Sequence, residues 1–91
     1  HEDNPPWTFL TNHAHVLLCI AHDHQSRIRD IAARVGITER AVQRIIAELE
    51  DAGYLKRRRS GRRNEYEIHS DIPLRHPMEA GKPVELLINL L

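Results

Sequence analysis

Apolar residues recur with the period of an α-helix in two neighbouring stretches in the middle of the chain. The first set, at positions i, i+3, i+4 and i+7, consists of Ile28, Ile31, Ala32 and Val35. The second set repeats the same spacing with Val42, Ile45, Ile46 and Leu49. Each set forms one apolar face. The pattern therefore predicts one helix over about 29–34 and another that begins after Thr38 and ends before Gly53.

The connection between these two helices is very short. Gly36 suits the left-handed position that follows a helix C-terminus, and Thr38 is a good N-cap for the next helix. Ile37 alone separates them. Two helices joined by so short a glycine turn must cross steeply, so the spacing predicts a helix-turn-helix.

The stretches near the two ends of the chain are apolar on more than one side. Asn12 is the predicted N-cap of a helix over about 13–22, in which most residues are apolar. Prolines and a glycine keep the stretch after residue 68 mostly irregular, and the nearly all-apolar segment 84–91 then predicts a short last helix. A helix that is apolar on several sides lies in the middle of a fold or is shared with a partner.

Two extended stretches, 54–59 and 64–68, flank Ser60-Gly61 and predict a β-hairpin. The hairpin places six cations in eight residues, namely Lys56, Arg57, Arg58, Arg59, Arg62 and Arg63. Self-repulsion makes such a hairpin unfavourable by itself, so a polyanion is its natural partner. An edge strand that is merely protected by charge needs only one or two lysines. We therefore predict that Arg57, Arg58, Arg59, Arg62 and Arg63 contact phosphates or the minor groove of DNA.

The charges are segregated along a chain whose formal net charge is zero. Residues 26–63 contain eleven Lys and Arg against five Asp and Glu, and the remainder contains two against eight. A basic middle directs the field of the protein toward one face, which makes nucleic acid the first candidate partner. The 91 residues fit a single domain over 1–91. No apolar run reaches the roughly 20 residues of a membrane span, and the lone Cys19 suits a reducing compartment, so we expect a cytoplasmic protein.

The face of the 38–53 helix opposite its apolar residues carries side chains that suit DNA. At 100° per residue, Arg40, Gln43, Arg44 and Ala47 lie on this outer face. Arg and Gln make paired hydrogen bonds to guanine and adenine edges in the major groove, and a small alanine allows a close approach. The Thr38 hydroxyl and the first amides of the helix can meet a phosphate. We therefore predict that this helix reads DNA through Thr38, Arg40, Gln43 and Arg44.

The stretch 27–55, which holds both periodic helices and their glycine turn, resembles the core of MarR-type winged helix regulators, and the hairpin resembles their wing. The resemblance covers about 26–68. It implies an α+β, mainly α fold, a winged helix-turn-helix with a three-helix core, a hairpin wing and a short C-terminal helix. The helix-turn-helix is then at about 28–53, the wing at about 54–68 and the C-terminal segment at 69–91. The short flanks, with Arg75-His76-Pro77 after the wing, resemble short single-domain members. The resemblance implies a transcriptional regulator, which we expect to be a repressor.

Two other functions remain open beside sequence-specific binding of double-stranded DNA. The first is a winged helix that serves as a protein-interaction or RNA-binding module. The second is a metal-responsive repressor, in which His15, Cys19 and His22 lie on one side of the first predicted helix. A soft-metal site usually draws on several thiolates, and Cys19 is more simply a small core residue, so we expect no metal or other cofactor. No catalytic motif is present, hence we expect no enzyme, and the sequence identifies no small-molecule effector.

The apolar ends predict a homodimer. One recognition helix covers only a few base pairs, and two helices placed about one DNA turn apart double the readout. Segment 84–91 has too many apolar residues for one side of a short helix, and it can meet the first helix and the N-terminal aromatic cluster across a two-fold axis. The predicted interface residues are Trp7, Leu18, Leu87, Leu90 and Leu91. The alternative is that the last helix folds back on the first helix of the same chain.

Overall fold

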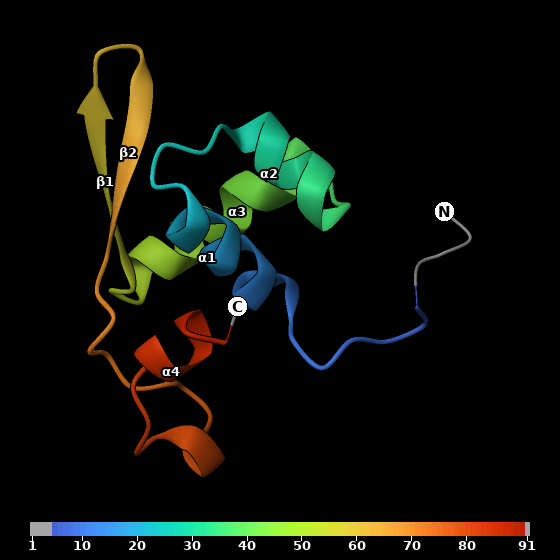
Figure 1. Ribbon diagram of the computed structural model, residues 1–91, viewed down its shortest axis with the longest axis vertical. Coiled ribbons are helices and arrows are strands. Elements are labelled where there is room, and N and C mark those ends of the chain that lie inside the picture. Colours follow the sequence, from blue (N-terminus) through green and yellow to red (C-terminus); the bar gives the residue numbers. More distant parts are fainter. Residues whose placement is uncertain (1–4, 91) are drawn as a thin grey trace.

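The computed structural model describes residues 5–90, which form a three-helix core, a β-hairpin and a C-terminal segment (Figure 1). The helices and strands, in chain order, are α1 (Asn12–His22), α2 (Ile28–Val35), α3 (Glu39–Asp51), β1 (Leu55–Ser60), β2 (Arg63–Ile68), the 3₁₀ helix η1 (Pro77–Glu79) and α4 (Glu85–Ile88). None of the helices within residues 5–90 is long and apolar enough to cross a membrane. This order of elements confirms the mainly α, α+β winged helix fold that the sequence predicts.

The turn between α2 and α3 has the predicted chemistry. Gly36 has φ = 87°, a left-handed conformation that favours glycine, and its N–H donates to the carbonyl of Ala32 at 2.8 Å. The Thr38 hydroxyl accepts a hydrogen bond from the N–H of Ala41 at 3.0 Å and caps α3. The end of α2 and the start of α3 are therefore fixed within three residues. So short a connection makes the two helices cross steeply, as in a helix-turn-helix.

The hydrophobic core lies between the three helices and the base of the hairpin. The predicted inner face of α3 is confirmed, because Val42, Ile45, Ile46 and Leu49 are all buried. The core is completed from the other elements mainly by Val16, Leu17, Ile20, Ile31, Tyr54, Leu55, Tyr66 and Val84. The outer face of α3 is thereby held in one orientation; its N-terminal part is open, and its later part, with Arg44, Ala47 and Glu48, borders a groove shared with α1.

The hairpin pairs Leu55 with Ile68 at its base and Ser60 with Arg63 at its tip. The turn therefore consists of Gly61 and Arg62, one residue later than the Ser60-Gly61 turn that the sequence predicts. Gly61 takes φ = 64°, the positive value that two-residue hairpin loops require. Beyond its base, the hairpin is attached to the helices by the N–H of Tyr66, which donates to the carbonyl of His24 at 2.9 Å.

Two helix boundaries differ from the predicted ones. The helix α1 is capped by Thr11 rather than Asn12, because the Thr11 hydroxyl accepts from the N–H of Ala14 at 3.3 Å. The last helix is shorter than predicted. It has no side-chain cap and closes with short-range turns at Asn89 and Leu90, so α4 covers only Glu85–Ile88.

The C-terminal segment folds back on its own chain, which is the alternative to a shared last helix. The Tyr54 hydroxyl donates to the carbonyl of Pro73 at 2.5 Å, and α4 packs against α1. In Figure 1 this segment lies at the end of the molecule opposite the tip of the hairpin.

The residues predicted for the dimer interface fall into two groups. Leu18 is buried within its own chain and offers little surface to a second copy, whereas Leu87 is half-buried against the core. Trp7 and Leu90 are 66% and 62% exposed. Leu91 lies outside the described residues. The exposed part of the predicted interface is therefore at the two extreme ends of the described chain.

Candidate nucleic-acid interface

The outer face of α3 presents the predicted base-reading residues to solvent. Thr38, Arg40, Gln43 and Arg44 are exposed, as is the small Ala47. The first half of this face carries Arg40 and Arg44, with the exposed Glu39 beside them in the first turn. Its second half carries Glu48 and Asp51, also exposed, which the sequence-based prediction did not take into account. A polyanion is therefore favoured at the N-terminal half of α3, where the helix dipole also attracts negative charge.

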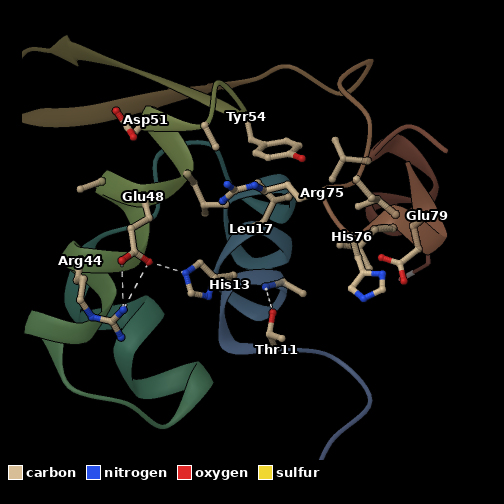
Figure 2. Close-up of a pocket in the computed structure, with 17 residues that line it drawn as sticks. Thr11, His13, Leu17, Arg44, Glu48, Asp51, Tyr54, Arg75, His76 and Glu79 are labelled. Atoms are coloured by element: carbon tan, nitrogen blue, oxygen red, sulfur yellow. Dashed lines mark hydrogen bonds and ion pairs between the residues drawn. The ribbon is translucent and has the colours of Figure 1, made fainter. Parts of the chain in front are cut away.

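Arg44 and Arg40 differ in their surroundings. The Arg44 guanidinium lies 3.4 Å from the Glu48 carboxylate, one helical turn away, and Glu48 also lies 2.6 Å from the Nε2 of His13 on α1 (Figure 2). The hydrogen bond with His13, assisted by Arg44, lowers the pKa of the Glu48 carboxyl. Arg40 makes no ion pair within residues 5–90. On the outer face of α3, Arg40 therefore has no acidic partner within the described chain, whereas the charge of Arg44 is partly compensated by Glu48.

Arg57 lies on the face of the hairpin that is directed toward the helices. Side chains alternate along a strand, so Arg57 lies on the same side as buried Leu55, toward the helices. Its guanidinium donates to the Glu50 carboxylate of α3 at 2.6 Å and 3.3 Å. This hydrogen bonding holds the pKa of Arg57 above its ordinary value despite partial burial. Arg57 therefore connects the wing to α3, and its predicted contact with DNA stays a prediction.

The outward face of the hairpin base carries acids opposite its cations. In the strand register Lys56 is paired with Glu67 and Arg58 with Glu65. The Arg58 guanidinium lies 2.7 Å from the Glu67 carboxylate, on the diagonal. The returning strand thus compensates the charge of the first strand at the base of the hairpin. The six-cation count did not include these glutamates, because their positions depend on the register.

The tip of the hairpin keeps its positive charge. Arg59, Arg62 and Arg63 are exposed and make no ion pair within the described chain. Arg59 donates to the carbonyl of Gly61 at 3.3 Å, which orders its side chain without neutralising it. We define these three arginines as the wing tip. They stand apart from the acids at the base of the hairpin and at the C-terminal half of α3.

The candidate metal residues on α1 lie in different environments. Cys19 is buried, whereas His22 is exposed and His15 is half-exposed. Burial raises the pKa of the Cys19 thiol, against a smaller lowering by Arg34, so the uncharged thiol is favoured. Among residues 5–90 no group of three or more His, Cys, Asp or Glu side chains is arranged to hold a metal ion.

A helix-turn-helix with exposed arginines on its second helix, followed by a hairpin with a basic tip, defines a winged helix domain. Residues 8–63, which are more than half of the chain, match the model of the MarR family. The chain therefore belongs to the MarR family, whose members are transcriptional regulators rather than enzymes. A search of curated proteins finds no match.

Proposed function

We propose that this protein binds a specific sequence in double-stranded DNA and represses transcription as a homodimer. The observation that carries the proposal is that positive charges without acidic partners in residues 5–90 lie on α3 and at the wing tip. Arg40 of α3 and the three arginines of the wing tip are exposed and make no ion pair within the described chain. A winged helix that inserts α3 into the major groove and lays its wing along the flanking phosphates uses these positions.

Sequence discrimination follows from the residue types on α3. Arg40 and Gln43 are exposed and can form paired hydrogen bonds with guanine and adenine edges. Glu48 and Asp51 disfavour phosphates near the other end of the helix. The combination orients the helix with its N-terminal half in the groove. A domain bound in this way excludes other proteins from the same base pairs, which is the basis of the repressor role we propose.

Duplex RNA fits this arrangement less well. The major groove of A-form RNA is deep and narrow, so side chains on α3 cannot reach its base edges. A protein-binding module does not require three uncompensated arginines at the wing tip. We therefore place duplex DNA before the RNA-binding and protein-interaction alternatives.

The dimer is needed for specificity. Two copies of α3 placed about 34–36 Å apart read two half-sites on one side of the duplex. A pseudo-palindromic site is the expected consequence, since a two-fold dimer presents the same helix twice.

Selection of bound sequences from random duplex DNA tests the proposal. We expect a pseudo-palindromic site whose half-sites are one helical turn apart. Arg40→Ala should then weaken binding to the selected site by about 1–3 kcal/mol and relax the base preference at one position of each half-site.

Lys82→Ala is the matched control, because Lys82 is an exposed cation in the C-terminal segment, away from α3 and the wing. It should leave affinity unchanged. No enrichment of any sequence, or equal affinity for duplex DNA, duplex RNA and single strands, would contradict the proposed function. An equal loss on selected and random DNA would show that Arg40 contacts phosphate alone.

A further inference from the structure

The residues that precede α1 form an arm with two uncovered aromatic side chains. We define residues 5–10 as the arm. Trp7 and Phe9 are 66% and 92% exposed, whereas both tyrosines of the chain are buried in the core. The rings of Trp7 and Phe9 meet edge to face, with centroids 5.0 Å apart. The Thr8 hydroxyl also donates to the carbonyl of Leu10 at 2.6 Å. The arm is therefore locally ordered although its own chain does not cover its aromatic rings.

A groove with an apolar floor lies between α1, α3 and the C-terminal segment (Figure 2). We call it the C-terminal groove, and its volume is about 1130 Å³. Pockets that hold drug-sized molecules measure about 300–1,000 Å³. The C-terminal groove is large enough for a peptide segment with two aromatic rings. Its floor is formed by Leu17, Leu49, Leu74, Val84 and Leu87.

The rim of the groove contains a guanidinium without an acidic partner. Arg75 is exposed and makes no hydrogen bond or ion pair through its side chain within residues 5–90. Figure 2 shows Arg75 directed from the C-terminal segment into the groove, while His76 and Glu79 lie beside it. A guanidinium binds well over the face of an aromatic ring, best of all tryptophan. The groove therefore combines an apolar floor with a partner for the face of an indole.

The arm does not enter the groove of its own chain. Thr11 lines the edge of the groove, so the two features begin at the same point. Thr11 is also the N-cap of α1 with an extended backbone, φ = −78° and ψ = 168°, which fixes the direction in which the chain leaves the helix. Pro5 and Pro6 further stiffen the arm. In Figure 1 the arm runs away from both the helical core and the C-terminal segment.

We propose that the arm of each copy enters the C-terminal groove of a second copy, so that Trp7 and Phe9 lie on the apolar floor and Trp7 meets Arg75. This inference rests on the proposed homodimer and specifies how it is built. The sequence-based prediction places the N-terminal aromatic cluster of one copy against segment 84–91 of the other. In the arrangement proposed here, each arm instead enters the C-terminal groove of the other copy. Leu86 and Leu90, the exposed apolar residues of the last turn, do not line the groove and stay outside this interface.

The exchange involves enough area for a stable dimer. A buried aromatic side chain contributes about 150–250 Å², and the exchange buries two on each arm against a matching area of groove. With both arms seated, the total reaches the roughly 1,200 Å² at which specific protein interfaces begin. Because the rings already hold each other in one geometry, little conformational freedom is lost when they bind.

Disulfide cross-linking tests the exchange directly. Thr8→Cys combined with His76→Cys places one thiol on the arm, between the two rings, and another on the rim of the groove, while the native Cys19 is buried and stays in all variants. Under mild oxidation we expect a disulfide-linked dimer of twice the chain mass. The matched control is Thr8→Cys with Glu85→Cys, since Glu85 is exposed but does not line the groove, and it should stay largely monomeric on a non-reducing gel. An intrachain disulfide in the first variant, or equal cross-linking in both, would overturn the proposal.

Fluorescence of Trp7, the one tryptophan of the chain, gives a second readout that requires no cysteine. We expect its emission to move to shorter wavelength as the protein is concentrated, in step with the rise in mass measured by light scattering. Trp7→Ser with Phe9→Ser should abolish the dimer without unfolding the monomer, because both side chains are exposed in the single chain. Leu86→Ser with Leu90→Ser is the matched control of similar exposure and should leave the dimer intact.

The outcomes separate this inference from the proposed function. A dimer that binds its selected DNA site but shows no emission shift and depends on Leu86 and Leu90 would overturn arm exchange and leave the DNA-binding function standing. A dimer that shows the shift and the cross-link but no preference for any duplex would support arm exchange and contradict the proposed function.

Discussion

The base and the tip of the wing use the same residue type for different purposes. At the base, Arg57 is bound to Glu50 of α3 and Arg58 to Glu67 of the returning strand, at 2.6 Å and 2.7 Å. At the tip, Arg59, Arg62 and Arg63 have no acidic partner within the described chain. The neutralised and the cationic regions adjoin on β1, because Arg59 follows Arg58 directly. A count of arginines therefore overstates the charge that the wing offers to DNA.

The difference indicates how a cationic hairpin stays folded before it meets a polyanion. The paired arginines at the base connect the wing to α3 and the two strands to each other. The unpaired arginines flank the turn of the hairpin, and Arg63 also lines a pocket with Asp23 and Asp30 near α2. Repulsion among them acts where the strands are already closed by the turn at Gly61. The same acids keep phosphate away from the base, so the wing is expected to contact DNA through its tip.

The largest effect is expected at the wing tip. Changing Arg59, Arg62 and Arg63 to Gln should weaken binding to every duplex and flatten its salt dependence. Each lost phosphate contact lowers the slope of log affinity against log salt by about 0.9, so three contacts lower it by about 2.7. Titrations with selected and random duplexes at several salt concentrations measure this slope. If the slope stays at its original value, the wing tip does not bind DNA.

A smaller effect, of a different kind, is expected at the base. Arg57→Gln removes the ion pair with Glu50, and a partly exposed pair of this type stabilises a protein by about 0.2–1 kcal/mol. The melting temperature should therefore fall by a few degrees, as expected for a domain of this size. The salt slope of DNA binding should change little. A loss of slope as large as that of one tip arginine would show that Arg57 leaves Glu50 and contacts phosphate.

The smallest effect is expected on the pH dependence of stability, through Glu48. Glu48 forms an ion pair with Arg44 on α3, as Glu67 does with Arg58 on the hairpin. The hydrogen bond with His13 lowers the pKa of Glu48 in the folded protein from its ordinary value of 4.5. A carboxyl whose pKa is lowered by folding adds stability above its ordinary pKa and loses it as the pH falls through the lowered value. The loss of melting temperature below pH 4.5 should therefore be shallower for Glu48→Gln than for the parent. Identical profiles between pH 3 and pH 6 would show that the His13–Glu48 contact does not persist in solution.

The sequence predicted the helix-turn-helix well because its signals are local. The apolar spacing of Val42, Ile45, Ile46 and Leu49 determines which side of α3 is buried, and therefore which residues are exposed. Gly36 and Thr38 carry out their turn and cap functions through contacts with residues three or four positions away. Patterns of this kind can be read from neighbouring residues alone.

The pairing of charges and the C-terminal groove could not be predicted in the same way. Whether Arg58 meets an acid depends on the register of the hairpin, and the turn lies one residue later than Ser60-Gly61. Arg57 meets Glu50 because the hairpin folds onto α3, which no local pattern specifies. The groove brings residues 74–87 next to α1 and α3, and a run of apolar residues near Val84 does not reveal where that segment packs. The length of α4 was overestimated because apolar content continues beyond the last helical hydrogen bonds.

The N–H of Tyr66 donates to the carbonyl of His24, which connects the wing to the loop between α1 and α2. The length of that loop therefore affects how the wing is placed relative to the helices. That loop holds the middle of β2 through this hydrogen bond, and its residues also line a pocket with Arg63 of the wing tip. Surface loops tolerate insertions and deletions far better than helices do. A change in the length of this loop is therefore a short evolutionary route to a new spacing between α3 and the wing tip, the two surfaces we propose to contact DNA. Related regulators could diverge in operator length along this route while every base-reading side chain stays the same.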